Sequence, residues 1–385
     1  MNSEIEPLIV ARLAAQRGRL QEWLVENAYP LWASSGVDIS TGAFHEALDL
    51  EGAPIQLPRR VRVQPRQVFA FSRAAAVGWR GNASSLVSRG IEVLRSEYRR
   101  PDGLYRALVG ADGSAIDDSA VLYDQAFVLL GFASAVPVLD AGAEMEQLAL
   151  SLRARIHDRW RAYDGSFLSG DKIDVRRRDS NPHMHLLEAC LAWAQVGSDS
   201  EWIRWVDELA DLAIQRFIVP ETGALVESLA DDWTPLPSQY DSRVEPGHQY
   251  EWAWLLMHCQ NANWVRRYAA ALRLIEVAEA RGVRSGYAIN SLNDDLTPRD
   301  GDSRLWPQTE RIKAACLAGK LTGDERYYGI AAQAVASVFR YLDTAVPGLW
   351  FDLRLADGRM AESAVPASTF YHLVGAIRAL AGRTF

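Results

Sequence analysis

Residues 42–49, GAFHEALD, are the first copy of a pattern that decides the fold of this chain. A glycine followed within two residues by an apolar or aromatic residue returns in GLYRALVG (103–110), GSFLSGDK (165–172), GALVESLA (223–230), GYAINSLN (286–293) and GLWFDLRL (348–355). The step from one marker glycine to the next is 58 to 63 residues. Such a steady step indicates a protein built from six copies of one structural unit.

Each copy predicts the same succession of elements. The marker glycine opens a short alternating stretch, closed in places by a turn such as Asp112-Gly113 or Asp357-Gly358. A helix rich in small apolar residues follows, for example HMHLLEACLAWAQV at 183–196, and then a charged amphipathic helix, for example EWIRWVDELADLAIQRF at 201–217. We expect the first helix to be buried and the second to lie outside, with one apolar face.

Six such hairpins cannot bury their apolar faces separately. Closing them into a toroid, with an inner ring of helices inside an outer ring, buries every inner helix and removes the need for caps. We therefore expect an all-α fold, an (α/α)6 barrel in which residues 1–385 form a single domain. Short β-hairpins and loops would roof one end, above a central cavity. An open α-solenoid is the structural alternative.

The bulk composition excludes several classes of function. The formal net charge of −8 argues against general binding of nucleic acid or acidic membranes, since both require a basic face. The basic run Arg176-Arg177-Arg178 is expected to be a solvated loop. Glu4 and Glu6 stand where a signal peptide needs positive charge, and no stretch approaches the roughly 20 apolar residues of a membrane span. We expect a cytoplasmic protein.

The cysteines indicate neither a metal site nor a disulfide framework. Cys190, Cys259 and Cys316 are an odd number, show no CxxC spacing and lie in apolar helical segments. We expect buried free thiols, no metal and no other cofactor.

Polar and aromatic residues recur near the start of the first helix of each unit, roughly 20 to 25 residues after the marker glycine. Equivalent positions in a closed repeat point toward one axis from the same end, so we expect these side chains to share a pocket. The set is Arg66, Tyr123, Gln125, His183, His185, His248, Glu251, Trp306, Glu310 and His372. One histidine at a helix start is more often structural, but four at equivalent positions favour a common function. His45, His157 and His258 fall outside the set and are expected to be structural or exposed.

The residue types of this set indicate proton transfer on a sugar. Histidine titrates near neutral pH, so two histidines on opposite sides of a substrate can act as base and acid. Arg66 supplies a permanent cation for an oxygen that becomes an enediolate. Glu251 shares a helix face with His248 and can orient a histidine or bind a sugar hydroxyl. Trp306 and Tyr123 offer flat apolar faces to a sugar ring. Glu188, three residues after His185, is expected to be a structural partner.

Four strings carry a resemblance to a known family. NPHMHLLEA (181–189), EPGHQYEWAWLL (245–256), RLWPQTERIKA (304–314) and FYHL (370–373) resemble, in order and spacing, the N-acylglucosamine 2-epimerase family. The likeness runs over nearly the whole chain, from RVQPR (62–66) onward. The family includes mannose isomerases, cellobiose 2-epimerases and sulfoquinovose isomerases, and its fold is the (α/α)6 barrel.

The resemblance implies a role for each catalytic candidate. His248 and His372 look like the acid/base pair that flanks the reacting carbons, and His185 looks like the polar ligand near the carbonyl or ring oxygen. Arg66 is similar to the family arginine that binds the oxygen of the open-chain sugar, and Glu251 to a hydroxyl-binding or histidine-orienting carboxylate. The remaining candidates, expected to bind substrate, are Tyr123, Gln125, His183 (whose match is weaker), Trp306 and Glu310.

The wording of the motifs looks most like the D-mannose isomerase branch. The resemblance thus implies interconversion of D-mannose and D-fructose through a cis-enediolate, with a small-molecule sugar as partner and a monomer or dimer as the assembly. N-acylglucosamine 2-epimerisation, or another sugar 2-epimerisation, is the alternative within the family. Outside it stand a metal-dependent isomerase, a glycoside hydrolase on the same barrel and a non-catalytic carbohydrate-binding protein.

Overall fold

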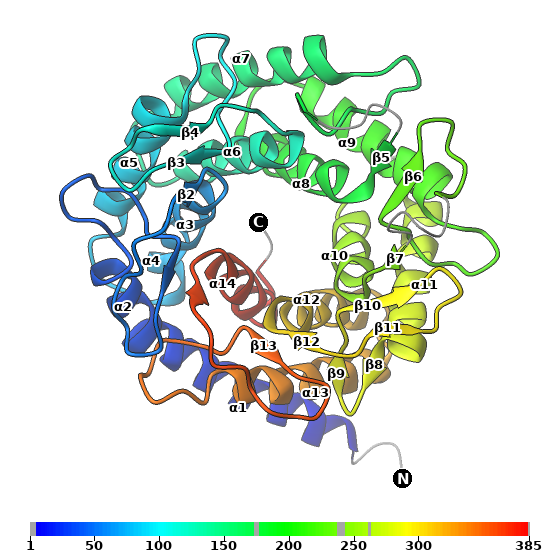
Figure 1. The fold of residues 1–385 in the computed structure, drawn as a ribbon. Helices are drawn as coiled ribbons and strands as arrows, with labels where there is room; N and C mark the ends of the chain where they lie inside the picture. The colour runs from blue at the N-terminus through cyan, green and yellow to red at the C-terminus, as the bar shows by residue number, and fades with distance from the viewer. Residues whose placement is uncertain (1–4, 173–176, 237–242, 261–262, 384–385) are drawn as a thin grey trace.

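The helices form two concentric rings around a central axis (Figure 1) in a computed structural model that describes residues 5–172, 177–236, 243–260 and 263–383. The inner ring consists of α3 (Val63–Ser72), α6 (Leu122–Ala135), α8 (Ser180–Val196), α10 (Pro246–Leu256), α12 (Leu305–Thr322) and α14 (Ser368–Leu380). The outer ring consists of α1 (Ile5–Trp23), α5 (Ala83–Val93), α7 (Gly142–Trp160), α9 (Glu201–Leu212), α11 (Trp264–Gly282) and α13 (Glu325–Tyr341). Shorter segments extend or join these helices: α2 (Tyr29–Ser34), α4 (Ala74–Val77) and the π-helical turns η1 (Leu24–Ala28), η2 (Leu94–Tyr98) and η3 (Ala213–Phe217).

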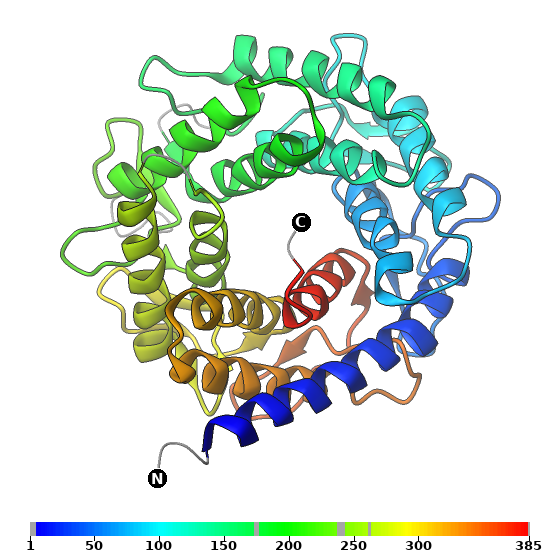
Figure 2. The same ribbon diagram turned by 180° about the vertical axis from the view of Figure 1, so that it is seen from behind.

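The ring is closed by its two ends. Each inner helix packs against the next one along the chain, and α14 packs against α3. The N-terminal helix α1 contacts α13 and α14, so the last inner helix takes its outer partner from the beginning of the chain (Figure 2). The expected (α/α)6 barrel is therefore confirmed and the open solenoid is wrong.

The two rings differ in burial as the sequence predicts. In α6 every residue except Tyr123 is buried, whereas α9 buries Trp202, Trp205 and Leu209 on one face and exposes its other face. Each fully buried large apolar side chain stabilises the fold by about 1.5–3 kcal/mol, so the inner ring and the inward stripe of the outer ring hold the barrel together. The expected second helix of 201–217 is α9 continued as η3.

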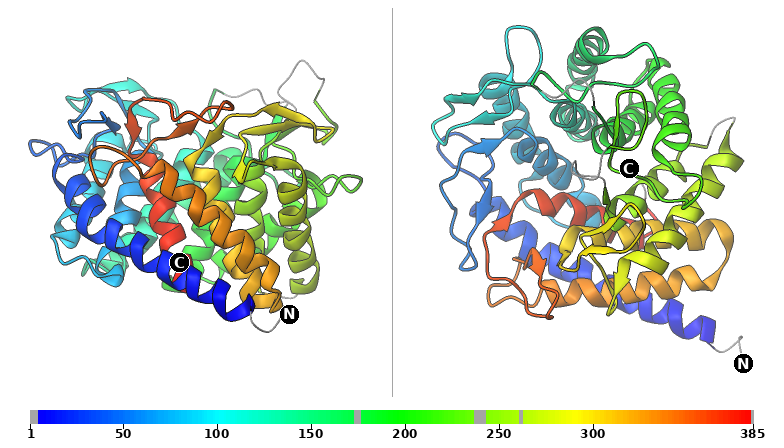
Figure 3. Two further views of the ribbon diagram at one scale, coloured as in Figure 1. Left: turned by 90° about the horizontal axis from the view of Figure 1, so that it is seen from below. Right: turned by 45° about the vertical axis from the view of Figure 1, so that its right-hand side comes forward.

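Short antiparallel strands gather at one end of the barrel (Figure 3, left). Most of the pairs join successive units, and β1 with β14 joins the first unit to the last, with Ala47 opposite Pro366 and Leu48 opposite Val365. The joining pairs are β1 (Ala47–Leu48) with β14 (Val365–Pro366), β2 (Arg59–Arg60) with β3 (Leu108–Val109), β5 (Arg177–Asp179) with β6 (Ser228–Ala230), β7 (Arg243–Val244) with β10 (Ser291–Asn293), and β12 (Ser303–Arg304) with β13 (Leu353–Arg354). β4 (Ala115–Asp117) pairs with β3, β11 (Pro298–Asp300) with β10, and β8 (Val283–Arg284) with β9 (Tyr287–Ala288).

The marker glycines are explained by their backbone. All six adopt a left-handed conformation, with φ between 72° and 97°. This region costs other L-residues energy because their Cβ crowds the following carbonyl. The turn that enters each unit therefore requires glycine, and its spacing in the sequence records the size of the repeat.

A side-chain amide on the inner helix anchors the residue two positions after the glycine. In the first unit the Gln64 amide accepts from the Phe44 N–H and donates to the Phe44 carbonyl, both at 2.9 Å. The same paired hydrogen bonds join Gln125 to Tyr105, Gln249 to Leu225 and Gln308 to Ala288. These bonds satisfy buried backbone groups and fix the rotation of each inner helix relative to its strand.

Two smaller expectations have their outcome here. Arg177 and Arg178 lie in β5 and not in a solvated loop: Arg178 is buried and Arg177 pairs with Asp179, while Arg176 lies outside the described residues. Cys190 and Cys259 are buried free thiols as expected, but Cys316 is only half-buried. Among the residues that the structure describes, none of the helices is both long enough and apolar enough to cross a lipid bilayer.

Candidate active site

A pocket of about 380 Å³ opens at the strand end of the barrel, where the inner helices begin. This volume lies within the roughly 300–1,000 Å³ common for small-molecule sites. The expected site residues that line it are Arg66, Tyr123, His185, His248, Glu251, Trp306 and His372. The repeat thus brings together side chains that lie up to about 300 positions apart in the sequence, and the imidazoles of the third, fourth and sixth units meet in one hollow.

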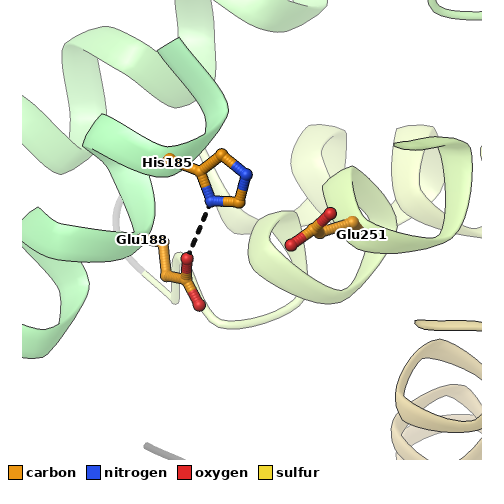
Figure 4. A group of neighbouring side chains, drawn as sticks. All are labelled: His185, Glu188 and Glu251. Carbon is orange, nitrogen blue, oxygen red and sulfur yellow. Dashed lines mark hydrogen bonds and ion pairs between the residues drawn. The ribbon is translucent and has the colours of Figure 1, made fainter. Parts of the chain in front are cut away.

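Each of the three pocket histidines hydrogen-bonds through Nδ1 to a buried glutamate. The distances are 2.9 Å from His248 to Glu227 and 2.8 Å from His372 to Glu310. His185 lies 3.0 Å from Glu188 on its own helix (Figure 4). A carboxylate at Nδ1 fixes the ring orientation and leaves Nε2 available to a substrate. The pocket therefore contains three imidazoles with the same orienting device.

The surroundings of His248 and His372 shift their pKa values in opposite directions. Burial disfavours the cation of His248. The carboxylates of Glu227 and of Glu245, the latter 3.7 Å from Nδ1, outweigh burial and raise the pKa of His248 to about 9. Burial lowers the pKa of His372 to about 4, although Glu310 opposes this effect. These opposite shifts favour the protonated form of His248 and the neutral form of His372.

His185 resembles His372 in charge. Its imidazole is buried between Tyr123 and Phe127, with ring centroids 5.0 and 4.4 Å away. Burial, with a smaller contribution from Arg66, lowers the pKa of His185 to about 4. Its partner Glu188 also accepts a short hydrogen bond from the Tyr371 hydroxyl, so this pair is held rigidly against the inner ring.

Trp306 lies beside both His248 and His372. Its ring centroid is 5.0 Å from that of His248 and 5.5 Å from that of His372. The indole is half-buried and lines the pocket, so a flat apolar face lies next to both imidazoles. A sugar ring or open chain packed on such a face is within reach of both imidazoles.

Arg66 is a pocket cation that is surrounded by aromatic rings. Its guanidinium lies over Phe127 at 4.0 Å and over Tyr371 at 5.5 Å, and it donates to the Tyr123 hydroxyl at 2.5 Å. No carboxylate forms an ion pair with Arg66 in the part of the chain that the structure describes. A buried guanidinium without an anion attracts negative charge that develops on a substrate oxygen.

Glu251 has an unusual environment for a carboxylate. It is 1 % exposed, faces His185 and Glu188 across the pocket (Figure 4), and neither of its oxygens has a hydrogen-bond partner among the described residues. Burial, together with repulsion from Glu310 and Glu188, raises the pKa of Glu251 well above its ordinary value. This shift favours the neutral carboxylic acid, a form that can donate a hydrogen bond to a sugar hydroxyl.

Three of the expected substrate-binding residues are not on the pocket surface. Gln125 is the amide anchor of the second unit, and His183 is the anchor of the third, since its Nε2 accepts from the Phe167 N–H at 2.9 Å. Glu310 lies behind His372 with no exposed surface. Gln125 and His183 lie two residues before the axis-facing positions of their helices, and side chains two residues apart on a helix point to nearly opposite sides. His45, His157 and His258 also lie outside the pocket.

The anchor residues show which position of each inner helix faces the axis, a relation that sequence reasoning missed. The residue two positions after the anchor faces the axis in each unit, which selects Arg66, Phe127, His185, Glu251 and Glu310. Glu310, pointing inward, reaches His372 rather than the pocket surface. In the sixth unit Phe370, packed on Trp350, stands in the anchor position, and two residues later comes His372.

Glu227, the orienting partner of His248, was also missed by sequence reasoning. It lies four residues after the marker Gly223, where the first and sixth units have Glu46 and Asp352. Glu46 pairs with Arg60, and Asp352 lines the pocket and accepts a hydrogen bond from Thr369. A carboxylate at this repeated position was therefore the signal that could have found Glu227. Glu251 does not orient His248, because Glu227 occupies its Nδ1.

Three sets of side chains have spacing that could hold a metal ion. Each combines one pocket histidine with two glutamates whose ligand atoms lie within 4.8 Å of one another. The sets are His185 with Glu188 and Glu251, His248 with Glu227 and Glu245, and His372 with Glu251 and Glu310. In every set the histidine already hydrogen-bonds to one of its glutamates, whereas Glu251, which belongs to two sets, has no hydrogen-bond partner among the described residues.

Comparison with known proteins agrees with this geometry. Residues 42–376 match the family model of N-acylglucosamine 2-epimerase (GlcNAc 2-epimerase). A mannose-6-phosphate isomerase of Rhizobium meliloti (strain 1021) is 42% identical over 371 residues, 94% of this chain and 96% of that protein. A D-mannose isomerase of Thermobifida fusca is 30% identical over 342 residues, 79% of this chain and 82% of that protein.

A solved structure extends the comparison to the fold. The crystal structure of a D-mannose isomerase superposes with a TM-score of 0.87 at 21% identity, covering 94% of this chain and 97% of the other. The sequence relatives are named isomerases of mannose or its phosphate, and the family model is that of an epimerase. The protein is therefore a sugar isomerase or epimerase, and the chain belongs to the N-acylglucosamine 2-epimerase family.

Proposed function

We propose that this enzyme interconverts D-mannose and D-fructose by moving a proton between C2 and C1 of the open-chain sugar. The observation that carries the proposal is a pair of histidines in one pocket, His248 and His372, which both lie beside Trp306 and each hydrogen-bond through Nδ1 to a buried glutamate. Neighbouring carboxylates raise the pKa of His248 to about 9, whereas burial lowers that of His372 to about 4. An aldose–ketose isomerisation requires one group that accepts a proton from carbon and one that donates a proton to oxygen. The two relatives named D-mannose isomerase or mannose-6-phosphate isomerase support the choice of a mannose sugar.

The reaction then follows from these charge states. Neutral His372 removes the C2 proton, and the electrons of the C2–H bond form the C1=C2 double bond. The carbonyl electrons move to O1, which takes a proton from His248. The resulting enediol loses its O2 proton to the now neutral His248 as C2=O forms, and C1 receives the proton from His372. Both histidines end in their starting states, so no external oxidant or reductant is needed.

Two other residues assist this reaction in our proposal. Arg66, a buried guanidinium whose partners are a phenol and aromatic rings, stabilises the negative charge that develops on the sugar oxygens. Glu251, as a neutral carboxylic acid without a partner, donates a hydrogen bond to a sugar hydroxyl, which also relieves the cost of its unsatisfied burial. His185 binds an oxygen of the substrate through Nε2.

The decisive experiment is incubation of mannose with the enzyme in deuterated water, followed by NMR of the products. The proposal expects fructose, and the deuterium at its C1 measures how far the transferred proton exchanges with solvent. Glucose carrying deuterium at C2 would instead identify a 2-epimerase, which must return the proton to the other face of C2. If neither product forms, the same experiment is repeated with N-acetylmannosamine, which is the substrate class of the epimerase alternative.

Variants of the acid/base pair test the mechanism itself. His248→Asn and His372→Asn each remove one proton-transfer group, and the loss in kcat should be at least about 10²-fold. Rates near those of the parent in both variants would contradict the assignment. Release of new reducing ends from an oligosaccharide would favour the glycoside hydrolase alternative. A non-catalytic binding protein would never turn mannose over.

A phosphorylated sugar is a second candidate substrate. One relative is named mannose-6-phosphate isomerase, and a second pocket of about 330 Å³, which shares Tyr123 and His248 with the first, is lined by Arg62, Arg177 and Arg243. Each of these arginines pairs with a carboxylate, so together they add little net positive charge. This pairing favours the uncharged sugar. A kcat/KM for mannose 6-phosphate above that for mannose would reverse the preference.

A further inference from the structure

Lys313 is a lysine buried beneath the candidate active site. It lies on α12, three residues after Glu310, and is 3 % exposed. Its ammonium group is 2.7 Å from Oε2 of Glu310 and 4.1 Å from the ring centroid of Trp254. Lysine is almost never fully buried unless it is paired, and here Glu310 is the partner that compensates the charge.

The ion pair of Lys313 continues directly into the active site. Glu310 offers its other oxygen, Oε1, to Nδ1 of His372 at 2.8 Å. The three side chains therefore form a line in which lysine neutralises the carboxylate from behind and the carboxylate orients the imidazole in front. Attraction to Lys313 and His372 outweighs burial and lowers the pKa of Glu310 to about 2, so this carboxylate stays ionised.

Comparison of the histidine–glutamate pairs reveals what distinguishes His372 from His248. Both imidazoles are buried and both contact a buried glutamate through Nδ1. Beside the His248 pair lies a second carboxylate, Glu245, which adds negative charge. Beside the His372 pair lies Lys313, which removes it. The ammonium of Lys313, with the guanidinium of Arg66, therefore distinguishes the His372 pair from the His248 pair, although Glu251 also lies near His372.

We propose that Lys313 is a positioning residue that keeps His372 neutral, and therefore able to act as the base, by neutralising Glu310. This inference rests on the proposed function, which makes His372 the base. Without the lysine the charge of Glu310 would be uncompensated and would stabilise the imidazolium, and the repulsion between the ammonium group and the imidazolium would disappear as well. Both effects favour protonation of His372. The other titratable or charged groups that face His372 are Arg66 on α3, His185 and Glu188 on α8, Glu251 on α10, and Tyr371 on α14.

The test compares Lys313→Met with Lys320→Met. Both lysines lie on α12 and line one cavity of about 460 Å³ below the active site, but Lys320 is exposed. In Lys313→Met we expect the acidic limb of the pH profile of kcat/KM to move to higher pH by at least about one unit. In Lys320→Met this limb should keep its position. Lys313→Arg, which retains a cation at the same place, should return this limb most of the way to its position in the parent.

Imidazole ¹⁵N NMR supplies a readout that does not depend on turnover. In the parent, His372 should titrate well below His248, and in Lys313→Met its midpoint should rise by the same amount as the kinetic limb. A variant that folds but leaves the His372 midpoint unchanged would overturn the proposal, whatever its activity. Failure of the parent to isomerise any sugar would sink the proposed function, while the NMR titration would still decide the coupling.

Folding of the variants is checked by circular dichroism and thermal unfolding. Should Lys313→Met not fold, Lys313→Gln is measured in its place, because it keeps a hydrogen-bond donor beside Glu310 but carries no charge. The parent alone also provides a decisive result. If His372 titrates at or above the midpoint of His248, the lysine does not hold it neutral and the proposal is wrong.

Discussion

Replacement of Glu227 by glutamine tests whether His248 is the acid. Glu227 Oε2 is 2.9 Å from Nδ1 of His248, and the second carboxylate, Glu245, is 3.7 Å from the same nitrogen. The amide oxygen of glutamine can still accept from Nδ1, so the ring orientation is kept. The negative charge is lost. The substitution therefore separates the electrostatic role of Glu227 from its orienting role.

The size of the effect follows from the distance. Two charges about 3–4 Å apart attract each other by about 4–5 kcal/mol at an effective dielectric constant of about 20. Since one pKa unit corresponds to about 1.4 kcal/mol, loss of this charge lowers the pKa of His248 by about three units. Starting from a pKa of about 9, the imidazole of Glu227→Gln would titrate near pH 6, by order of magnitude.

The sign of the kinetic change follows from the role of His248. A general acid works only while it is protonated, so kcat/KM falls as the pH rises through its pKa. In the parent this falling limb should lie near pH 9, because the pKa of His248 is raised to about 9. In Glu227→Gln it should lie about three units lower, and the rate at pH 8 should drop roughly a hundredfold relative to the parent.

The assay is a pH–rate profile for mannose isomerisation, measured by fructose release between pH 5 and pH 10. The matched control is Glu46→Gln, which changes the carboxylate at the same position of the first repeat unit, where its partner is Arg60 and not a histidine. Its alkaline limb should remain near that of the parent. The reasoning is refuted if Glu227→Gln folds and keeps an alkaline limb near pH 9.

Four other changes test the same geometry. Arg66→Met should lower kcat by about 10²–10³-fold, the usual cost of losing one group that stabilises an oxyanion, with an unchanged circular dichroism spectrum. Glu251→Gln should keep kcat/KM within about tenfold of the parent because a neutral hydrogen-bond donor remains, whereas Glu251→Ala should lose more; equal losses would mean that the carboxylate acts in its ionised form. His183→Ala should reduce the free energy of unfolding by about 1–3 kcal/mol in urea titrations, while His183→Gln should lose less, since glutamine is the anchor in four other units. Dialysis against a chelator should leave full activity, and recovery of lost activity by one divalent ion would show that one of the histidine–glutamate sets binds metal.

The period of the sequence determined the architecture of this protein. The marker glycines must be glycine because their backbone is left-handed, and their spacing therefore reports the repeat directly. The apolar first helix and amphipathic second helix then dictate an inner and an outer ring. The spacing after each marker glycine also predicted that Arg66, His185, His248 and His372 would lie at the same end of the axis, and all four line one pocket.

Only the tertiary structure decided which neighbour each of these side chains has. A spacing known to within a few residues cannot tell a residue that faces the axis from one that faces its own strand, since two positions along a helix turn a side chain by about 200°. Gln125 and His183 therefore proved to be anchors. The charge of an imidazole depends on contacts made across the barrel, Glu227 for His248 and Glu310 with Lys313 for His372. Electrostatic interactions act through space over a few ångströms, and distance along the chain says nothing about them until the ring has closed.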